Sequence, residues 1–261
     1  MRDLFSISGK VALVTGGSRG IGKMIAECYL RAGARVFLSS RKAEACAAAE
    51  KELSQYGEVT ALPADVSERG QCERLIGEVG ERVGQLHVLV NNAGATWGAA
   101  FDEFPDSAWD KVLGLNVRAP FVLTQLGRAL LEASATEDDP ARVINIGSID
   151  GLMVPGFKNF SYSASKAALH HLTRHMAAEL APKILVNAIA PGPFPSKMMD
   201  ATLDKHGDAI RAKSPVGRVG RTEDVGAAAI YLASPATTFM TGAVIPLDGG
   251  LSTTVGMGVE I

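Results

Sequence analysis

The chain has 261 residues, a length that suits one large domain or two small ones. Apolar residues make up 47% of it and charged residues 21%, which is the balance of a globular protein. The net charge is -2, so there is no basic excess with which to hold nucleic acid, and we expect no nucleic-acid partner.

Three cysteines, Cys28, Cys46 and Cys72, form no CxxC pair. An odd set of this kind predicts free thiols in a reducing compartment, not a disulfide framework or a zinc site. No apolar run reaches the length of a membrane span, and the first residues lack the apolar core of a signal peptide. We expect a cytoplasmic protein without a membrane span.

Residues 11–14 form a short apolar run that predicts a buried strand. The stretch 15–22, Thr-Gly-Gly-Ser-Arg-Gly-Ile-Gly, follows it and precedes a helical pattern. A strand, a glycine-rich turn and a helix together place a pyrophosphate on backbone N–H groups at the helix N-terminus. Gly16, Gly20 and Gly22 would allow the turn and the close approach of the ligand. A plain flexible turn is the competing interpretation.

The next expected strand, residues 35–39, is followed by Ser40, Arg41 and Lys42. In NAD-binding proteins an acidic residue usually ends this strand and binds the ribose 2′-hydroxyl. Serine and arginine instead suit a 2′-phosphate, and Arg19 in the glycine-rich loop adds a second positive charge. The pattern predicts NADP over NAD. The alternative is that Arg41 and Lys42 are solvated residues that start a helix.

Helices and strands continue to alternate along the chain, with expected segments at about 42–56 (helix), 58–62 (strand), a helix ending near 83, and 87–90 (strand). This alternation predicts an α/β fold, a single Rossmann-type doubly wound parallel sheet of about seven strands with helices on both faces. Ligands of such sheets bind beyond the carboxyl ends of the strands. Gly16, Ser40, Asp65 and Asn91 follow strands and should therefore gather along one edge.

An expected helix beginning near Asp106 contains Asn116, four residues before Pro120. Proline has no N–H group, and its ring collides with the carbonyl of residue i−4. The Asn116 carbonyl therefore loses its helical partner and needs another, such as a water molecule. We expect a kink with a bound water there, with Asn116 as ordinary helix filler as the alternative.

A polar loop is expected at 132–141, and the strand 142–146 then delivers Gly147 and Ser148 to the same sheet edge. Tyr162 and Lys166 follow at the start of an expected helix, where positions i and i+4 share one face. An ammonium beside a phenol favours the phenolate and should lower the pKa of Tyr162. Considered alone, the pair is also compatible with a solvated helix face.

These motifs together resemble the classical short-chain dehydrogenase/reductase family over about residues 9–250. The motifs that carry the resemblance are Thr-Gly-x-x-x-Gly-x-Gly (15–22), Asp65, Asn-Asn-Ala-Gly (91–94), Asn116, Ser148, Tyr162 with Lys166, and Pro191-Gly192. The resemblance implies a single domain over residues 1–261, with a cofactor half to about 147 and a catalytic and substrate half from 148. It also implies hydride transfer between NADP(H) and a carbonyl carbon.

The resemblance assigns catalytic roles to four residues. Tyr162 gives the proton to the carbonyl oxygen, and Ser148 hydrogen-bonds that oxygen. Lys166 holds the nicotinamide ribose and lowers the tyrosine pKa, while Asn116 anchors a water in the proton relay. The cofactor-binding residues it implies are Gly16, Ser18, Arg19, Gly20, Ile21, Gly22, Ser40, Arg41, Asp65, Val66, Asn92, Ala93, Gly94, Tyr162, Lys166, Pro191, Gly192 and Ser196.

The chain departs from the family pattern at a few positions. Gly147 stands where a serine often precedes the catalytic serine, and Ser196 replaces the usual threonine but keeps the hydroxyl. The segment 181–187 is one residue shorter than the common form, and the loop around residues 137–140 is longer. None of these departures falls on the four catalytic positions.

Substrate specificity should come from loops over the site that are rich in methionine and aromatic residues, which suit an extended apolar substrate. The candidate substrate residues are Trp97, Met153, Phe157, Phe194 and Met198. Lys158, Lys197 and Lys205 would meet an acidic carrier protein at the mouth, or are simply solvated.

Within the family the chain is most similar to β-ketoacyl reductases. This resemblance implies NADPH-dependent reduction of a 3-oxoacyl thioester, of acyl carrier protein or coenzyme A, to the 3-hydroxyacyl form. One alternative is an NADPH reductase of another ketone, steroid, quinone or polyol. Another is a non-enzymatic NADP-sensing scaffold, which would not need the proton-donor set Ser148, Tyr162 and Lys166.

His171 and His175 are four residues apart, but no third ligand has suitable spacing, so we expect no metal site. The resemblance implies a homotetramer assembled through the helices near 106–131 and 161–180 and the C-terminal strand. The strand region 243–250 and the apolar tail to Ile261 fit an end of the chain that a partner covers.

Overall fold

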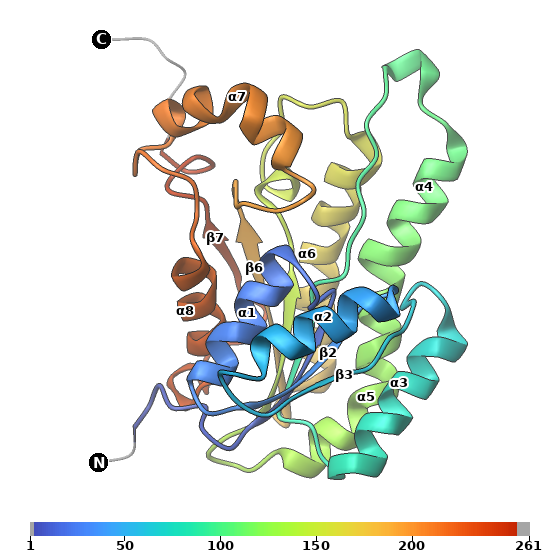
Figure 1. Cartoon of the computed structure of the whole chain (residues 1–261), viewed down its shortest axis with the longest axis vertical. Coiled ribbons are helices and arrows are strands. Elements are labelled where there is room, and N and C mark those ends of the chain that lie inside the picture. Colours follow the sequence, from blue (N-terminus) through green and yellow to red (C-terminus); the bar gives the residue numbers. More distant parts are fainter. Residues whose placement is uncertain (1–2, 255–261) are drawn as a thin grey trace.

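The computed structural model describes residues 3–254 of the chain. They fold into a three-layer α/β structure (Figure 1) whose sheet consists of β1 Val11–Thr15, β2 Arg35–Ser39, β3 Val59–Ala61, β4 Val88–Asn91, β5 Ala141–Ile146, β6 Ile184–Pro191 and β7 Val244–Leu247. The helices are α1 Gly20–Arg31, α2 Ala43–Leu53, α3 Arg69–Val83, α4 Asp106–Leu113, α5 Ala119–Ser134, α6 Phe160–Leu180, α7 Asp200–Lys213 and α8 Thr222–Ala233. The predicted doubly wound sheet is confirmed.

The seven strands are all parallel, in the order β3-β2-β1-β4-β5-β6-β7. The order reverses direction between β1 and β4, where the chain crosses from one half of the sheet to the other. Such a switch point opens a crevice beyond the carboxyl ends of the strands. The glycine-rich loop follows β1, and the segment from Asn92 follows β4, so both lie at that crevice.

Two apolar clusters cover the two faces of the sheet. One contains buried side chains of α1, α2 and α8, and the other contains those of α3, α5 and α6. Strands β1 and β6 are buried along their whole length, as continuous apolar strands of a parallel sheet should be. The helices therefore lie on both faces, as Figure 1 shows, and leave the carboxyl edge for loops and α7.

The expected break at Pro120 is present and takes a specific form. Residues Gly114–Arg118 form a π-helical segment (η2) between α4 and α5, and the Ala119 N–H bonds the Gly114 carbonyl five residues back. A π-turn changes the spacing of hydrogen bonds, so it accommodates a proline that cannot donate one. The helical irregularity expected from Pro120 is present as this π-helical segment, which contains Asn116.

Several element bounds differ from the expected ones. Helix α5 runs on to Ser134, so the polar loop is shorter than the expected 132–141, and β3 covers only three residues. Good helix formers at the end of α5 continue to bond along the helix despite their polarity. The structure describes the chain up to residue 254, so the rest of the apolar tail, to Ile261, lies outside the described residues.

Among residues 3–254, no helix combines the length and the apolar character that a membrane span requires. The three thiols are free, as predicted, and Cys46 and Cys72 are buried in the helices that carry them.

The contact between α1 and α8 generates a stability prediction. A Cβ at Gly226 of α8 would lie 2.1 Å from Cys28 Sγ of α1, so Gly226→Ala should force the two helices apart. We expect a loss of about 1–3 kcal/mol in the free energy of unfolding, the usual cost of overpacking a core. Gly77→Ala is the matched control, because nothing lies within 4 Å of its Cβ position in α3. Alanine there should stabilise by about 0.5–1 kcal/mol. Urea unfolding of both variants checks the pair, and equal effects would contradict the packing described.

Candidate active site

The glycine-rich loop leads into an uncapped helix N-terminus. Helix α1 begins at Gly20, and the preceding Arg19 makes no side-chain capping hydrogen bond. The first N–H groups of a helix have no partner within it, and together with the helix dipole they favour an anion. This end of α1 therefore fits the diphosphate of a dinucleotide.

Asn92 braces the glycine-rich loop from the neighbouring strand end. Its Nδ2 donates to the Thr15 carbonyl at 2.9 Å and to the Gly16 carbonyl at 3.2 Å. A Cβ at Gly22 would lie 2.4 Å from the same Nδ2, so only glycine permits this approach. Thr15 Oγ1 accepts hydrogen bonds from the backbone N–H groups of Asn92 and Ala93. In the structure, the Asn92 side chain shapes the cofactor loop.

Ser40 and Arg41 lie where β2 ends, as predicted. The Arg41 side chain is 63% exposed, and its guanidinium is 3.9 Å from the Asp65 carboxylate. Asp65 Oδ1 is held by the backbone N–H and the hydroxyl of Ser67. The Arg41 cation is therefore accessible at the edge where a 2′-phosphate is expected, and its role in binding it stays a prediction.

Other predicted cofactor residues meet at this edge. A Cβ at Gly20 would lie 3.2 Å from the Cβ of Ser196, which places the loop after β6 across the glycine-rich loop. Gly192 packs against Asp248 in the same way. The structure thus brings together residues that are far apart in the sequence, and their contacts with the cofactor stay a prediction. Of the remaining predicted members, Ser18 lies in the glycine-rich loop and Ile21 in the first turn of α1. Val66 lies between β3 and α3, Gly94 after β4, and Pro191 at the end of β6.

Lys166 is a buried ammonium. It is 4% exposed, and its Nζ donates to the Ile146 carbonyl at 2.7 Å, at the end of β5. Burial lowers the pKa of Lys166 to about 8, and the Asp150 carboxylate partly opposes this shift. Lys166 Nζ lies 5.5 Å from the centroid of the Tyr162 ring. The two side chains share a helix face, as predicted.

The expected fall in the pKa of Tyr162 is wrong in this structure. Burial raises the pKa of Tyr162 to about 12, the hydrogen bond with Ser148 opposes that rise, and the Asp150 charge adds to it. The Lys166 ammonium lies over the ring and is bonded to a backbone carbonyl. Loss of hydration therefore outweighs any help from the cation, and the phenol stays protonated.

Asn116 connects the π-helical segment with the loop after β4 and with α6. Its Oδ1 accepts from the Ala95 N–H at 2.8 Å, and its Nδ2 donates to the Ala95 carbonyl and to Ser165 Oγ. Ser165 in turn donates to the Tyr162 carbonyl at 2.7 Å. The Asn116 side chain therefore fixes the backbone around Tyr162. The water predicted at its main-chain carbonyl stays a prediction.

Ser148 follows β5 and begins a short 3-10 turn, Ile149–Gly151 (η3). Directly before it, Gly147 leaves space that the imidazole of His170 fills. A Cβ at Gly147 would lie 2.1 Å from His170 Nε2. His170 is 3% exposed, and burial lowers its pKa to about 4, so the imidazole is neutral. Glycine thus replaces the family's serine at position 147 because the His170 side chain occupies the space that a serine side chain would need.

The candidate substrate residues separate into two groups. Trp97, Met153, Phe157 and Met198 are between 38% and 51% exposed, in the loops that follow β4, β5 and β6. Phe194 is 2% exposed and packs in the core against Gly220. A substrate contact by Phe194 is not supported by its position, because its ring faces other side chains. For the exposed four, substrate contact stays a prediction.

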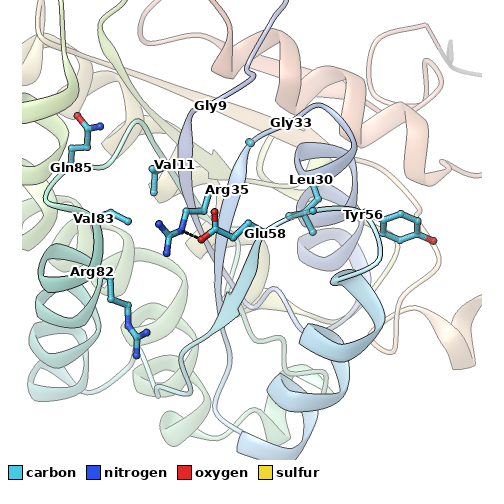
Figure 2. A pocket seen from close by; sticks show the side chains of 12 residues that line it. Gly9, Val11, Leu30, Gly33, Arg35, Tyr56, Glu58, Arg82, Val83 and Gln85 are labelled. Carbon is cyan, nitrogen blue, oxygen red and sulfur yellow. Dashed lines mark ion pairs between the residues drawn. The ribbon is translucent and has the colours of Figure 1, made fainter.

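A hollow of about 530 Å³ lies elsewhere on the molecule (Figure 2). It is lined at the amino ends of β1 and β2, and it contains the ion pair between Arg35 and Glu58 at 2.8 Å. That edge is opposite to the one carrying Ser148 and Tyr162, so the hollow is separate from the candidate active site. Within residues 3–254, no group of three or more His, Cys, Asp or Glu side chains is placed to hold a metal ion.

Sequence reasoning missed four residues that contact the catalytic set. Ser165 bonds Asn116, His170 packs against Gly147 and Gly151 beside Ser148, and Asp150 and Asn159 hydrogen-bond one another near Tyr162. Helical spacing from Tyr162 and Lys166 gave a signal for Ser165 and His170. Asp150 and Asn159 belong to a loop without periodicity, so only the folded backbone reveals their bond.

Comparison with known proteins agrees with this geometry. The profile of a family described as enoyl-(acyl carrier protein) reductase matches residues 16–252. A Pseudomonas aeruginosa rhamnolipids biosynthesis 3-oxoacyl-[acyl-carrier-protein] reductase is 50% identical over 253 residues, which is 96% of this chain and 99% of that protein. A 5-keto-D-gluconate 5-reductase of Escherichia coli is 34% identical, over 96% and 98% of the two chains.

The solved active-site complex of Pseudomonas aeruginosa RhlG with NADP superposes with a TM-score of 0.93 at 49% identity, and covers 97% of this chain and 100% of that one. The chain therefore belongs to the short-chain dehydrogenase/reductase family. The resemblance to β-ketoacyl reductases expected from the sequence as a whole is confirmed, because the 50% identical relative is a 3-oxoacyl-[acyl-carrier-protein] reductase.

The contact between Gly147 and His170 predicts that substitutions at these two positions have coupled effects on the free energy of unfolding. Gly147→Ser should cost about 1–3 kcal/mol of stability, because its side chain would collide with the imidazole. His170→Ala opens that space, so the same serine should cost much less in the His170→Ala background. We expect a coupling energy above about 1 kcal/mol from a double-mutant cycle of unfolding free energies. Strict additivity would show that the two positions do not share the space.

Proposed function

We propose that the protein is an NADPH-dependent oxidoreductase that reduces a 3-oxoacyl thioester to the 3-hydroxyacyl thioester. The observation that carries this proposal is the meeting of Ser148, Tyr162 and Lys166 at the sheet edge that also holds the uncapped N-terminus of α1. The 50% identity to a 3-oxoacyl-[acyl-carrier-protein] reductase over almost the whole chain supports the thioester as substrate.

NADPH suits the residues present. The first N–H groups of α1 would donate hydrogen bonds to the diphosphate, and Arg41 with Ser40 suits the 2′-phosphate. Lys166 lies near Gly94, where a Cβ would be 3.8 Å from its Nζ, and can reach a ribose there. The hydride that reduces the carbonyl carbon comes from the bound nicotinamide.

The proton comes from the protein. Ser148 donates a hydrogen bond to the carbonyl oxygen, and the Tyr162 hydroxyl gives that oxygen its proton as the carbon accepts the hydride. The raised pKa of Tyr162 keeps the donor protonated at neutral pH, and the Lys166 ammonium stabilises the phenolate that remains. Asn116 and Ser165 keep the backbone of Tyr162 in place.

A second candidate substrate class is a sugar-derived ketone. The 34% identity to a 5-keto-D-gluconate 5-reductase supports it. Four apolar side chains are exposed around the site: Trp97, Met153, Phe157 and Met198. They favour an acyl chain over a polyol, because an acyl chain would bury their apolar surface against apolar atoms and a polyol would not. Comparing turnover of 3-oxoacyl thioesters and keto-sugars separates the two classes.

We further propose that acyl carrier protein or coenzyme A carries the substrate and that the enzyme works in the cytoplasm, where its three free thiols remain reduced. We also propose a homotetramer. Leu113 of α4 and Phe121 of α5 expose apolar surface on the helices expected to pair, at 37% and 44%. Light scattering that reports a monomer at working concentration would contradict the tetramer.

The proton-donor role predicts a large loss on Tyr162→Phe. This change removes the hydroxyl and keeps the ring, so we expect the rate of NADPH oxidation with a 3-oxoacyl thioester to fall about a thousandfold. Fluorescence titration should show that NADPH still binds. Tyr56→Phe is the matched control, because its hydroxyl lies at the opposite edge of the sheet. A Tyr162→Phe enzyme with normal turnover would exclude Tyr162 as the donor.

The position of Arg41 predicts the cofactor preference. Arg41→Asp places a carboxylate beside the expected 2′-phosphate, which it should repel. We expect the KM for NADPH to rise about tenfold or more, with little change in the KM for NADH. Steady-state kinetics with both cofactors measure this, and Arg69→Asp on the exposed face of α3 is the control. An unchanged ratio of the two KM values would exclude Arg41 from the cofactor site.

A further inference from the structure

Asp150 is an acidic residue inside the active site to which the mechanism above gives no role. It lies in the turn η3, two residues after Ser148, and its backbone N–H donates to Ser148 Oγ at 3.1 Å. That bond occupies an acceptor site of the serine hydroxyl and leaves its proton free to point elsewhere. The orientation of Ser148 is therefore coupled to the position of Asp150.

The Asp150 side chain reaches across to the start of α6. Its Oδ2 accepts a hydrogen bond from Asn159 Nδ2 at 2.8 Å. Asn159 is 9% exposed, and its carbonyl accepts from the backbone N–H groups of Tyr162 at 2.9 Å and Ser163 at 3.0 Å. One side-chain bond thus connects the turn after Ser148 with the first turn of the helix that carries Tyr162.

The turn is also packed directly on α6. A Cβ at Gly151 would lie 2.6 Å from the carbonyl carbon of Lys166 and 2.7 Å from the N of Ala167. Only glycine allows the turn to approach the helix backbone so closely. Asp150 therefore has a fixed position relative to the Tyr162 and Lys166 pair.

Asp150 is the carboxylate whose charge acts on both catalytic groups. It raises the pKa of Tyr162 and that of Lys166, in each case as a smaller effect than burial. Burial raises the pKa of Asp150 itself, while the bond from Asn159 and the Lys166 charge oppose that rise. His170 also faces this cluster, and burial together with the charges of Lys166 and Arg174 lowers its pKa, so it is neutral. Ser148 contributes a hydrogen bond to Tyr162.

We propose that Asp150 is a positioning residue of this active site. Its carboxylate places a negative charge near Tyr162 and Lys166, and its bond with Asn159 fixes the position of Ser148 relative to Tyr162. This inference rests on the proposed reductase function. The bond also closes the neck of the loop 152–158, whose Met153, Val154 and Phe157 are 42%, 90% and 51% exposed.

Asp150→Asn tests the charge, because an amide keeps the shape and an acceptor for Asn159. Without the carboxylate, both the phenol and the ammonium lose their protons at lower pH. We expect the alkaline limb of the kcat profile for carbonyl reduction to move to lower pH by about half a unit or more, with kcat at pH 7 within about threefold of wild type. If Asp150→Asn does not fold, Asp150→Ser removes the same charge and serves in its place.

Asn159→Ala tests the bond and leaves the charge. We expect kcat to fall about tenfold because Ser148 and Tyr162 lose their register, while the alkaline limb stays where it is in the wild type. Asp208→Asn is the control for the loss of one carboxylate, since the Asp208 side chain is 98% exposed on α7. It should change neither kcat nor the profile.

The outcomes are distinct. A profile of Asp150→Asn that superposes on that of the wild type overturns the charge role, and wild-type kcat in Asn159→Ala overturns the positioning role. A wild type that oxidises no NADPH with a 3-oxoacyl thioester overturns the proposed substrate, and the profiles are then recorded with the best carbonyl from a panel of ketones and keto-sugars. A wild type that reduces no carbonyl overturns both proposals.

Discussion

A buried ammonium connects the strand that delivers Ser148 with the helix that delivers Tyr162. Lys166 Nζ donates to the carbonyl of Ile146, the last residue of β5, while its own backbone belongs to α6. A buried charge that loses its partners costs several kcal/mol, so α6 cannot slide along the sheet without a large penalty. The relative position of Ser148 and Tyr162 follows from that constraint. The buried bond from Lys166 to the Ile146 carbonyl therefore fixes the distance between the end of β5 and the first turns of α6.

A second constraint holds the cofactor edge together. Thr15 and Asn92 bond one another's backbone at the ends of β1 and β4, which is the point where the sheet order reverses. Gly16, with a φ of +66°, and Gly22 leave the room that this bracing needs. The crevice is thus built from the loop glycines and one asparagine, and the N-terminus of α1 points into it without a capping side chain.

The fold and the catalytic residues could be predicted from sequence because their signals are local or periodic. Alternating strands and helices define the doubly wound sheet, and helical spacing alone places Tyr162 and Lys166 on one face. Pro120 indicated the helical irregularity that the structure shows as a π-helical segment. The direction in which the pKa of Tyr162 is shifted could not be predicted in this way. It depends on burial and on Asp150, whose position is set by a turn and by the Asn159 bond. Phe194 was expected to contact substrate, but it is buried in the core. From the sequence, an apolar loop residue is equally compatible with a core and with a substrate pocket until its neighbours are known.

The absence of a serine before Ser148 and the presence of His170 are one feature of packing. The imidazole fills the space that a side chain at position 147 would need, and its lowered pKa makes it an uncharged neighbour of Lys166. Because the imidazole is uncharged, the charges near Tyr162 are those of Lys166, 5.5 Å from the centroid of its ring, and of Asp150, which have opposite signs. Burial then amplifies the effect of each charge, because the effective dielectric is lower than in water. Burial raises the pKa of Tyr162 most, the hydrogen bond with Ser148 opposes that rise, and the Asp150 charge adds to it. The position of that charge depends on Gly151, which lets the turn pack directly against the backbone of α6.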